Sequence, residues 1–560
     1  MRQYMYCSRP VTAAALVLLF LGVQCMTGVD STRPVSRMSV QTLRDKMEGG
    51  WVGQMIGVTY GTPWEFKYNS AMMPDSVQPS WSAEMPDETY AKTPGAYDDL
   101  YVDLTFLEVY AWNSQSSSLD YAEAFGKTTY WLWFANQMTR SNIRNGIMPP
   151  QSGHWIRNPE CTSIDFLITS DFIGLVNPGL RAEALALADT IGHITAYGDG
   201  YYGGVFVSQL YASAFLTNDI AAVVDTALSA IPRKSLFYRM INDVIEFHRR
   251  NPLDWRANWQ YIHDRYADEN GSPFGVFDPW NIEASMNAAH VVTGLLYGDG
   301  DIGKTMEIAV RCGDDADCNP GTCAGILGTM KGLTGIPEEY KQKLPEVYDR
   351  HFMGSEFSLQ DAVEICMTAA LQNIEEAGGD VGDDGIVIVG TDAPVAHLEV
   401  ARPEHHPVQR IDLTRKVGPR DPLALRYLST GERGADATRN GDSLVIAPDL
   451  FNAPHEFSFE GNGFCTFGKV VSDSAGEWNF VDDSTSALVY VDGLLTDRVV
   501  FPLGFENRRF LTFFDYRLNQ GTHTIRFVAE GERPPGYRFE LYHTILYSNT
   551  RLDQTSRTSR

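Results

Sequence analysis

Apolar residues recur at helical spacing from about residue 39 to residue 373 of this 560-residue chain. In residues 205–216 (VFVSQLYASAFL) and 286–297 (MNAAHVVTGLLY) they fall at positions i, i+3 and i+4, which is typical of a helix with one buried face. Residues 49–57 (GGWVGQMIG) and 321–333 (GTCAGILGTMKGL) carry glycines three or four positions apart, and small residues on one face allow helices to pack closely. These patterns predict a compact all-α domain over residues 38–375.

The pattern changes to strand spacing near residue 376. Residues 376–385 (EAGGDVGDDG) have the Gly and Asp content of a linker. After them, short apolar or alternating segments have the pattern of strands: 386–389, 487–492, 522–528 and 538–547. Short strands without intervening helices predict a second domain over residues 386–548, an antiparallel β-sandwich or jelly roll, and a disordered polar tail at 549–560.

The N-terminal segment has the composition of a secretory signal peptide over residues 1–26. Arg2 and Arg9 precede the apolar run 11–23 (VTAAALVLLFLGV), which is too short to span a bilayer comfortably. We therefore expect export to the periplasm or the extracellular space, without a lipid anchor at Cys25, because the residues before it form a poor lipobox. No later segment reaches the length of a transmembrane helix, so no stable membrane insertion is expected.

Charge and cysteine content narrow the range of partners. With 71 acidic and 45 basic side chains, the chain has a formal net charge of −26, which opposes binding to phosphate backbones and anionic membranes. A nucleic-acid partner is therefore not expected, and nothing in the sequence predicts a protein partner. The eight cysteines form neither a disulfide framework nor a CxxC zinc pattern, and the redox state of Cys312, Cys318 and Cys323 stays open.

Acidic residues beside glycines or helix starts are the strongest candidates for chemistry. Asp98 and Asp99 precede a helical pattern, and residues 313–319 (GDDADCN) precede the glycine-rich helix. Mg²⁺ and Ca²⁺ prefer carboxylate oxygens, and acidic groups from two distant segments could complete a two-metal site. Acids also cap helix N-termini, which is the better interpretation for Asp98 and Asp99 alone. Three acids within residues 314–317 exceed what one cap needs, so a divalent-metal site is the favoured interpretation.

Other residues are weaker candidates for substrate binding. Trp64 lies beside Glu65 and would form a wall against a sugar ring, because tryptophan faces stack well on sugars. His193 and Asp199 lie in a glycine- and tyrosine-rich stretch that leads into a helix. They are kept as substrate-binding candidates, although packing and turn roles are more common for such residues.

The order of these motifs resembles the ADP-ribosylglycohydrolase family over residues 40–339. The family's glycine-rich helix ending in a Glu-Phe pair is matched by GGWVGQMIG…TPWEF, and its Thr-Asp-Asp motif by Tyr97-Asp98-Asp99. Its Gly-Asp-Thr-Asp-Thr motif is matched by residues 314–318 (DDADC). The resemblance implies an all-helical hydrolase that uses two Mg²⁺ ions, with Ca²⁺ or Mn²⁺ as alternatives, to cleave the glycosidic bond at an ADP-ribosylated side chain or a related ribosyl link.

The resemblance also implies roles for individual residues. Asp98 and Asp99 would hold the metal ions on one side, and Asp315 and Asp317 on the other. Glu65 would face the sugar as an acid/base or positioning residue. Asp99 is taken as a catalytic residue as well as a metal ligand.

Departures from the family pattern bear on the substrate. Tyr97 and Cys318 replace the family's threonine ligands, and Gln54 stands where an aspartate is expected. The family's nucleotide-binding loop should fall at residues 161–175, but the sequence there is CTSIDFLITSDFIGL, without the Gly-Asn-Gly or the arginine that would hold a diphosphate. Asp165 of this segment is instead a candidate for binding the substrate.

The sequence therefore favours an exported, metal-dependent glycoside hydrolase of the ADP-ribosylglycohydrolase fold that acts on a glycan or ribosyl-type substrate. An exported enzyme meets glycans rather than ADP-ribosylated proteins. Two alternatives stay open: a true ADP-ribosyl hydrolase and a non-catalytic carbohydrate-binding protein. The sandwich is expected to fold independently, because its strand pattern is complete and a Gly/Asp linker precedes it. By analogy with other exported hydrolases it would bind carbohydrate, with Tyr490, Phe513 and Tyr537 as candidate aromatics, and a stability role is the alternative.

Overall fold

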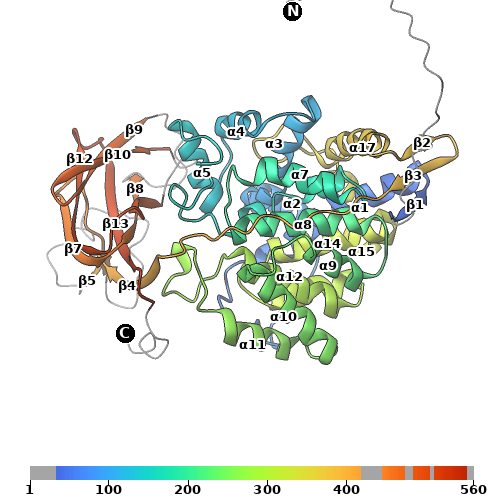
Figure 1. Ribbon diagram of the computed structural model, residues 1–560, viewed down its shortest axis with the longest axis horizontal. Helices are drawn as coiled ribbons and strands as arrows, with labels where there is room; N and C mark the ends of the chain where they lie inside the picture. Colours follow the sequence, from blue (N-terminus) through green and yellow to red (C-terminus); the bar gives the residue numbers. More distant parts are fainter. Residues whose placement is uncertain (1–32, 418–443, 473–482, 505–509, 552–560) are drawn as a thin grey trace, which may run out of the picture.

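The computed structural model describes residues 33–417, 444–472, 483–504 and 510–551. The predicted signal peptide and residues 552–560 of the predicted tail lie outside these residues. The described chain forms an all-helical domain followed by antiparallel β-sheets, which confirms the predicted fold class (Figure 1). Within the described residues, no helix is long and apolar enough to cross a membrane.

The first domain is built almost entirely from helices. The α-helices are α1 (Val40–Gly61), α2 (Met85–Lys92), α3 (Asp98–Trp112), α4 (Ser118–Lys127), α5 (Phe134–Arg144), α6 (Asp171–Leu175), α7 (Arg181–Gly192), α8 (Asp199–Ala214), α9 (Ile220–Leu228), α10 (Leu236–Arg250), α11 (Trp255–Tyr266), α12 (Ala284–Gly298), α13 (Ile302–Arg311), α14 (Cys318–Lys331), α15 (Glu338–Lys341), α16 (Leu344–Val347) and α17 (Leu359–Glu376). Short 3₁₀ helices occupy Thr62–Trp64, Pro94–Tyr97, Ile164–Phe166, Pro273–Gly275 and Leu333–Gly335.

Within the described part of the chain, the strands form two larger sheets and two small ones. They are β1 (Val35–Met38), β2 (Asp380–Gly382), β3 (Gly385–Val389), β4 (His406–Asp412), β5 (Arg415–Val417), β6 (Leu444–Ile446), β7 (His455–Gly461), β8 (Gly463–Ser472), β9 (Ser484–Val491), β10 (Leu494–Pro502), β11 (Leu511–Asp515), β12 (Gly521–Glu530) and β13 (Tyr537–Ser548). The larger sheets have the orders β10-β9-β12-β7 and β11-β8-β13-β4. Between them, Phe513 of β11 stacks on Phe527 of β12 with ring centroids 4.0 Å apart, so the two sheets form a sandwich and Phe513 belongs to its core.

The first predicted strand of the sandwich belongs instead to the helical domain. β3 pairs with β1 and β2, and its Ile386 and Ile388 are buried in the helical domain's core. The predicted linker is likewise ordered, because α17 extends to Glu376 and β2 occupies Asp380–Gly382. Alternating apolar residues correctly predict a strand at β3, but they do not show that its partner lies at the start of the domain.

The chain between the domains is an extended segment, residues 390–405, that runs along the helical domain (Figure 1). The Tyr202 hydroxyl donates a hydrogen bond to the carbonyl oxygen of His397 at 2.8 Å. The Arg402 side chain is buried and donates to the hydroxyl of Thr162 at 3.2 Å. These contacts hold the connection on the helical surface, so an ordered chain sets the position of the sandwich.

The sandwich packs on the helical domain through the sheet β11-β8-β13-β4. One hydrophobic cluster contains buried residues of both domains: Met138, Val276, Cys465, Phe467, Leu511, Tyr516, Ile545 and Tyr547. The rings of Phe274 and Phe467 meet across the interface with centroids 4.9 Å apart. Separating the domains would expose this cluster to water, so docking adds to the stability of the sandwich, which also has a hydrophobic core of its own. Independent folding of the sandwich stays a prediction.

Helices α1 and α14 lie almost backbone to backbone. The residues of α1 that face α14 are spaced four apart: Gly49, Gly53, Gly57 and Gly61. A Cβ atom at Gly57 would lie 2.1 Å from the carbonyl oxygen of Pro320, and one at Gly61 would lie 1.9 Å from that of Ala316. This packing brings the end of α1, which leads to Glu65, next to the acidic loop at residues 313–317.

The substitution Gly57→Ala is expected to destabilise the protein, because the added methyl group has no room unless α1 and α14 separate. Overpacked core sites typically cost about 1–3 kcal/mol, and a clash with backbone belongs at the upper end. Thermal unfolding measures the effect. Gly382→Ala is the matched control, because no atom lies within 4 Å of its added Cβ. Equal melting temperatures for the two variants would contradict the close packing.

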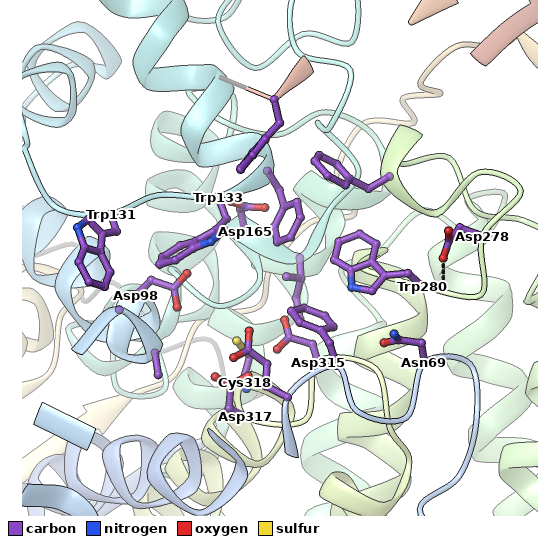
Figure 2. Close-up of a pocket in the computed structure, with 18 of the residues that line it drawn as sticks. Asn69, Asp98, Trp131, Trp133, Asp165, Asp278, Trp280, Asp315, Asp317 and Cys318 are labelled. Carbon is purple, nitrogen blue, oxygen red and sulfur yellow. Dashed lines mark hydrogen bonds between the residues drawn. The ribbon is translucent and has the colours of Figure 1, made fainter. Parts of the chain in front are cut away.

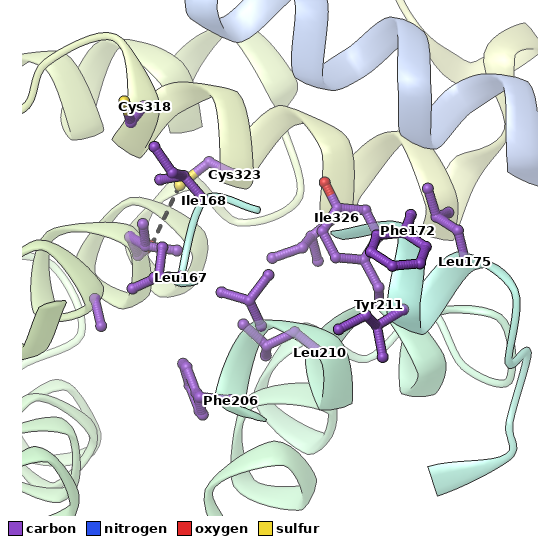
Figure 3. Close-up of a cluster of buried hydrophobic side chains, with 14 of the residues drawn as sticks. Leu167, Ile168, Phe172, Leu175, Phe206, Leu210, Tyr211, Cys318, Cys323 and Ile326 are labelled. Atoms are coloured by element: carbon purple, nitrogen blue, oxygen red, sulfur yellow. Dashed lines mark hydrogen bonds between the residues drawn. The ribbon is translucent and has the colours of Figure 1, made fainter. Parts of the chain in front are cut away.

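Behind the acidic loop, side chains of α6, α8 and α14 form a core that holds α14 in place (Figure 3). Phe172 of α6, Leu210 of α8 and Ile326 of α14 are fully buried there. The Tyr211 hydroxyl donates to a carboxylate oxygen of Asp171 at 2.7 Å. This packing fixes the N-terminus of α14, where the second acidic motif lies.

Candidate functional site

The acidic motifs lie at a cavity between the helical domain and the sandwich (Figure 2). The cavity has a volume of about 820 Å³ and is lined by carboxylates, by aromatic rings of both domains and by a few basic side chains. The carboxylates that line it are Glu65, Asp98, Asp165, Asp278, Asp315 and Asp317.

Four aspartates from two distant segments meet around Cys318. Asp98 and Asp99 occupy the first turn of α3, and Asp315 and Asp317 lie in the loop that leads into α14. One carboxylate oxygen each of Asp98 and Asp99 lies within 4.8 Å of the other and of Cys318 Sγ, and the same holds for Asp315 and Asp317. The structure therefore brings together all four aspartates that the sequence predicts as metal ligands.

Three of these carboxylates are buried with few hydrogen-bond donors, and Asp98 is half-buried. Asp99, Asp315 and Asp317 are 0%, 3% and 2% exposed, and both oxygens of Asp99 and Oδ1 of Asp315 have no hydrogen-bond partner. Burial raises the pKa of Asp315 to about 8, and the charge of Glu65 adds to the effect. Burial likewise raises the pKa of Asp99 well above its usual range, with a further contribution from Asp317.

The buried cluster needs protons or bound cations to balance its charge. The partnerless oxygens of Asp99 and Asp315 fit a hard divalent cation such as Mg²⁺, Ca²⁺ or Mn²⁺, which prefers oxygen ligands. Burial raises the pKa of the Cys318 thiol well above its usual range, so this thiol is a weak, neutral ligand among carboxylates. The donor set therefore suits a hard cation better than zinc, with Asp98, Asp99, Asp315 and Asp317 as the residues that would hold it.

Asp314 does not line the cavity but anchors the acidic loop. It has a positive φ of 55°, its Oδ1 accepts a hydrogen bond from the Ser70 N–H at 2.7 Å, and its Oδ2 lies 3.1 Å from Nε2 of His290 on α12. The N–H of Phe66 also donates to the carbonyl oxygen of Asp314 at 3.1 Å. These bonds tie the loop that follows Glu65 to the loop that carries the predicted metal ligands.

Of the two predicted catalytic residues, only Glu65 lines the cavity, since Asp99 is fully buried behind it. Asp99 is therefore assigned to the carboxylate cluster and not to direct contact with substrate. The Glu65 side chain is open to the cavity, but the surrounding protein and the charge of Asp317 raise its pKa well above the usual range. A carboxyl group that keeps its proton beside a reacting bond is suited to general acid catalysis.

Asp165 also lines the cavity, and its orientation is fixed. Its carboxylate accepts hydrogen bonds from the Asn136 N–H at 2.9 Å and from the Ser163 hydroxyl at 2.5 Å. Burial raises the pKa of Asp165 to about 6 in spite of these bonds. The segment 161–175, where the resemblance implies a nucleotide-binding loop, thus presents a carboxylate to the cavity.

The other three predicted substrate-binding residues do not line this cavity and have structural roles. Trp64 packs against the core of the helical domain. His193 Nε2 lies 2.8 Å from a carboxylate oxygen of Glu399 in the segment that joins the domains. Asp199 accepts a hydrogen bond from the Phe237 N–H at 3.0 Å, at the start of α10. The packing and turn interpretations describe these residues better than substrate binding.

Aromatic residues are the part of the site that sequence reasoning missed. Trp131, Trp133 and Trp280 line the cavity, and Figure 2 shows them around the carboxylates. The run WLWF at residues 131–134 was a visible signal. Aromatic residues most often form cores, however, and only the fold shows that these rings face a cavity.

Without metal, the free energy of unfolding is expected to fall as the pH rises from about 4 to about 8. Between its usual pKa near 3.8 and its native pKa of about 8, Asp315 binds its proton in the native state and not in the unfolded chain, so rising pH removes stability. Mg²⁺ binds deprotonated carboxylates, so it should raise the melting temperature more at pH 8 than at pH 5. Thermal unfolding with EDTA or Mg²⁺ measures both effects, and a larger Mg²⁺ effect at pH 5 would contradict the assignment.

Fold and site together define a class of protein: an all-α domain with paired aspartates at the starts of two helices. The sequence model of the ADP-ribosylglycohydrolase family matches residues 39–371, and the chain belongs to this family, which implies hydrolase activity. The match confirms the resemblance predicted from the motifs. A similar solved structure is described as "ADP-ribosylglycohydrolase-related protein complex"; it is 13% identical with a TM-score of 0.35, over 60% of this chain and 99% of that chain. None of the curated proteins compared matches the chain.

Proposed function

We propose that this protein is an exported, divalent-metal-dependent glycoside hydrolase that acts on a glycan. The observation that carries the proposal is the cluster of four aspartates beside an aromatic-walled cavity. Glycosidic bonds break through an oxocarbenium-like transition state, which nearby carboxylates stabilise. Export rests on the composition of residues 1–26.

The positions of the cavity residues support separate parts in this reaction. A divalent cation bound by the four aspartates would supply Lewis-acid chemistry at a substrate or water oxygen. Glu65 would hold a proton near the oxygen of the leaving group. Asp165, held by Ser163 and the Asn136 N–H, would orient a sugar hydroxyl. Asp314 would keep the two loops in register through its bonds to Ser70 and His290.

The lining of the cavity supports a glycan over a nucleotide. A diphosphate is usually held by arginine or lysine side chains or by backbone N–H groups, and residues 161–175 contain no basic residue. Two lysines and one arginine line the cavity, and Lys92 and Arg410 form ion pairs with neighbouring acids. The family match favours the second candidate, a true ADP-ribosyl hydrolase.

A screen for released products tests the proposal. The purified protein is incubated with a panel of glycans and, in parallel, with an ADP-ribosylated arginine peptide, in EDTA or in Mg²⁺. We expect sugar release from at least one glycan, lost in EDTA and restored by Mg²⁺ or Mn²⁺. Release of ADP-ribose alone would identify the second candidate. Glycan binding without any turnover would identify a carbohydrate-binding protein.

A further inference from the structure

The sandwich supplies one wall of the cavity that holds the carboxylates. Its lining residues belong to one sheet, where they lie on β4, β8 and β13 or, for Phe510, directly before β11: Arg410, Phe467, Gly468, Lys469, Phe510, Tyr542 and His543. Phe467 and Lys469 are two residues apart on β8, so they share one face of the strand. The sandwich is therefore part of the site and not a module attached beside it.

Two β-bulges occur in this wall at the level of Phe467. β13 carries one between Leu541 and His543, and β11 carries one between Leu511 and Phe513, on opposite sides of β8. Successive strand residues normally point to opposite faces, yet Tyr542 and His543 both line the cavity. Bulges re-aim side chains and are common beside functional sites. The bulge in β13 thus allows Tyr542 to line the cavity beside His543.

A continuous series of ring contacts joins this wall to the carboxylates. Phe66, the neighbour of Glu65, lies 5.0 Å from Trp280 between ring centroids, and Trp280 lies 5.6 Å from Phe274. Phe274 lies 4.9 Å from Phe467, which stacks on His543 at 4.3 Å. These rings form a continuous apolar lining from one domain to the other, with neighbouring ring planes inclined at 42°, 54° and 89° along the series from Phe66 to Phe467. The face of a sugar ring is suited to pack on an individual aromatic ring of such a lining.

The wall is also held firmly against the helical domain. Arg410 Nη1 lies 3.5 Å from Asp278 Oδ2, and the Phe510 N–H donates to Gln137 Oε1 at 3.3 Å. Together with the shared hydrophobic cluster, these contacts preform the cavity on both sides. A volume of about 820 Å³ lies near the upper end of ordinary ligand pockets, and one sugar ring would fill only part of it.

We propose that the sandwich wall and Trp280, which faces it from the helical domain, form a second subsite, which binds the sugar residues of the glycan beyond the cleaved bond by stacking on Trp280 and Tyr542. The inference rests on the proposed function for its substrate class. It predicts that the protein prefers oligosaccharides to the corresponding monosaccharides.

A binding experiment with an Asp315→Asn background tests this subsite without turnover. The probe is a glycan array of neutral and acidic oligosaccharides with their monosaccharides, and ADP-ribose is measured separately. Adding Tyr542→Ala should weaken oligosaccharide binding about tenfold, as expected for the loss of one good stacking contact. Trp280→Ala, on the other domain, is a second variant with the same expected result. Tyr490→Ala is the matched control, because this half-buried ring lies in the other sheet and does not line the cavity.

The outcomes separate the subsite from the proposed catalysis. Oligosaccharide binding that depends on Tyr542 and Trp280 supports the subsite, even if the wild type hydrolyses no glycan and the catalytic proposal fails. Equal binding of monosaccharides and oligosaccharides would overturn the subsite, as would equal losses for Tyr542→Ala and Tyr490→Ala. Binding of ADP-ribose without binding of any oligosaccharide would overturn it as well.

Discussion

Replacing Asp315 with alanine is expected to abolish both turnover and the stabilisation of the protein by Mg²⁺. Asp315 is 3% exposed, has an oxygen without a hydrogen-bond partner and lies in the same cluster as Asp317. A ligand present at 100 times its Kd stabilises the native state by about 2.7 kcal/mol, and the variant should lose this increment. In EDTA at a pH above 8, the variant loses packing contacts with the smaller side chain, which lowers its free energy of unfolding. It also lacks the buried charge of Asp315, and this should offset part of that loss.

Thermal unfolding with and without Mg²⁺ measures this effect, and a turnover assay accompanies it. Asp278→Ala is the matched control, because Asp278 lines the same cavity outside the cluster and pairs with Arg410. The control should keep its full response to Mg²⁺. If Asp315→Ala responds to Mg²⁺ as the wild type does, the acidic cluster is not the metal site.

The substitution Glu65→Gln is expected to reduce kcat by about 10²- to 10⁴-fold, the usual contribution of a general acid or base. The amide has nearly the size of the carboxylic acid, but it cannot donate the proton that the raised pKa of Glu65 retains. Stabilisation by Mg²⁺ should persist, because the four aspartates remain. Glu108→Gln, on an exposed position of α3, is the control with the same chemical change. Full activity of the Glu65 variant would remove this residue from the mechanism.

The acidic cluster could be predicted from the sequence because its signal is local. Three acids within residues 314–317 exceed the needs of a helix cap, and their order after Glu65, Asp98 and Asp99 resembles a known family. The glycine spacing of α1 was likewise a local signal, and the structure shows the close helix contact that it implies. Local patterns of this kind determine which residues share a face of a helix. This relation does not depend on how the rest of the chain folds, so it can be predicted from the sequence.

The rest of the site depends on contacts between distant segments. The contact of Phe274 with Phe467, which connects Trp280 to the sandwich wall, exists only because the sandwich docks on the helical domain. The pairing of β3 with β1 similarly joins the two ends of the helical domain. For His193 the sequence led to a wrong prediction of substrate binding. Its Nε2 lies within hydrogen-bond distance of Glu399 in the segment that joins the domains, and it does not line the cavity. Sequence periodicity contains no information on such partners.

Anomalous scattering from a crystal grown with Mn²⁺ tests the central claim most directly. Mn²⁺ has an oxygen-ligand preference similar to that of Mg²⁺ and can be located by its own signal. We predict manganese peaks between the Asp98–Asp99 pair and the Asp315–Asp317 pair, beside the cavity that Glu65 lines. Manganese bound only elsewhere, or no peak at a Mn²⁺ concentration that saturates the thermal shift, would contradict the account.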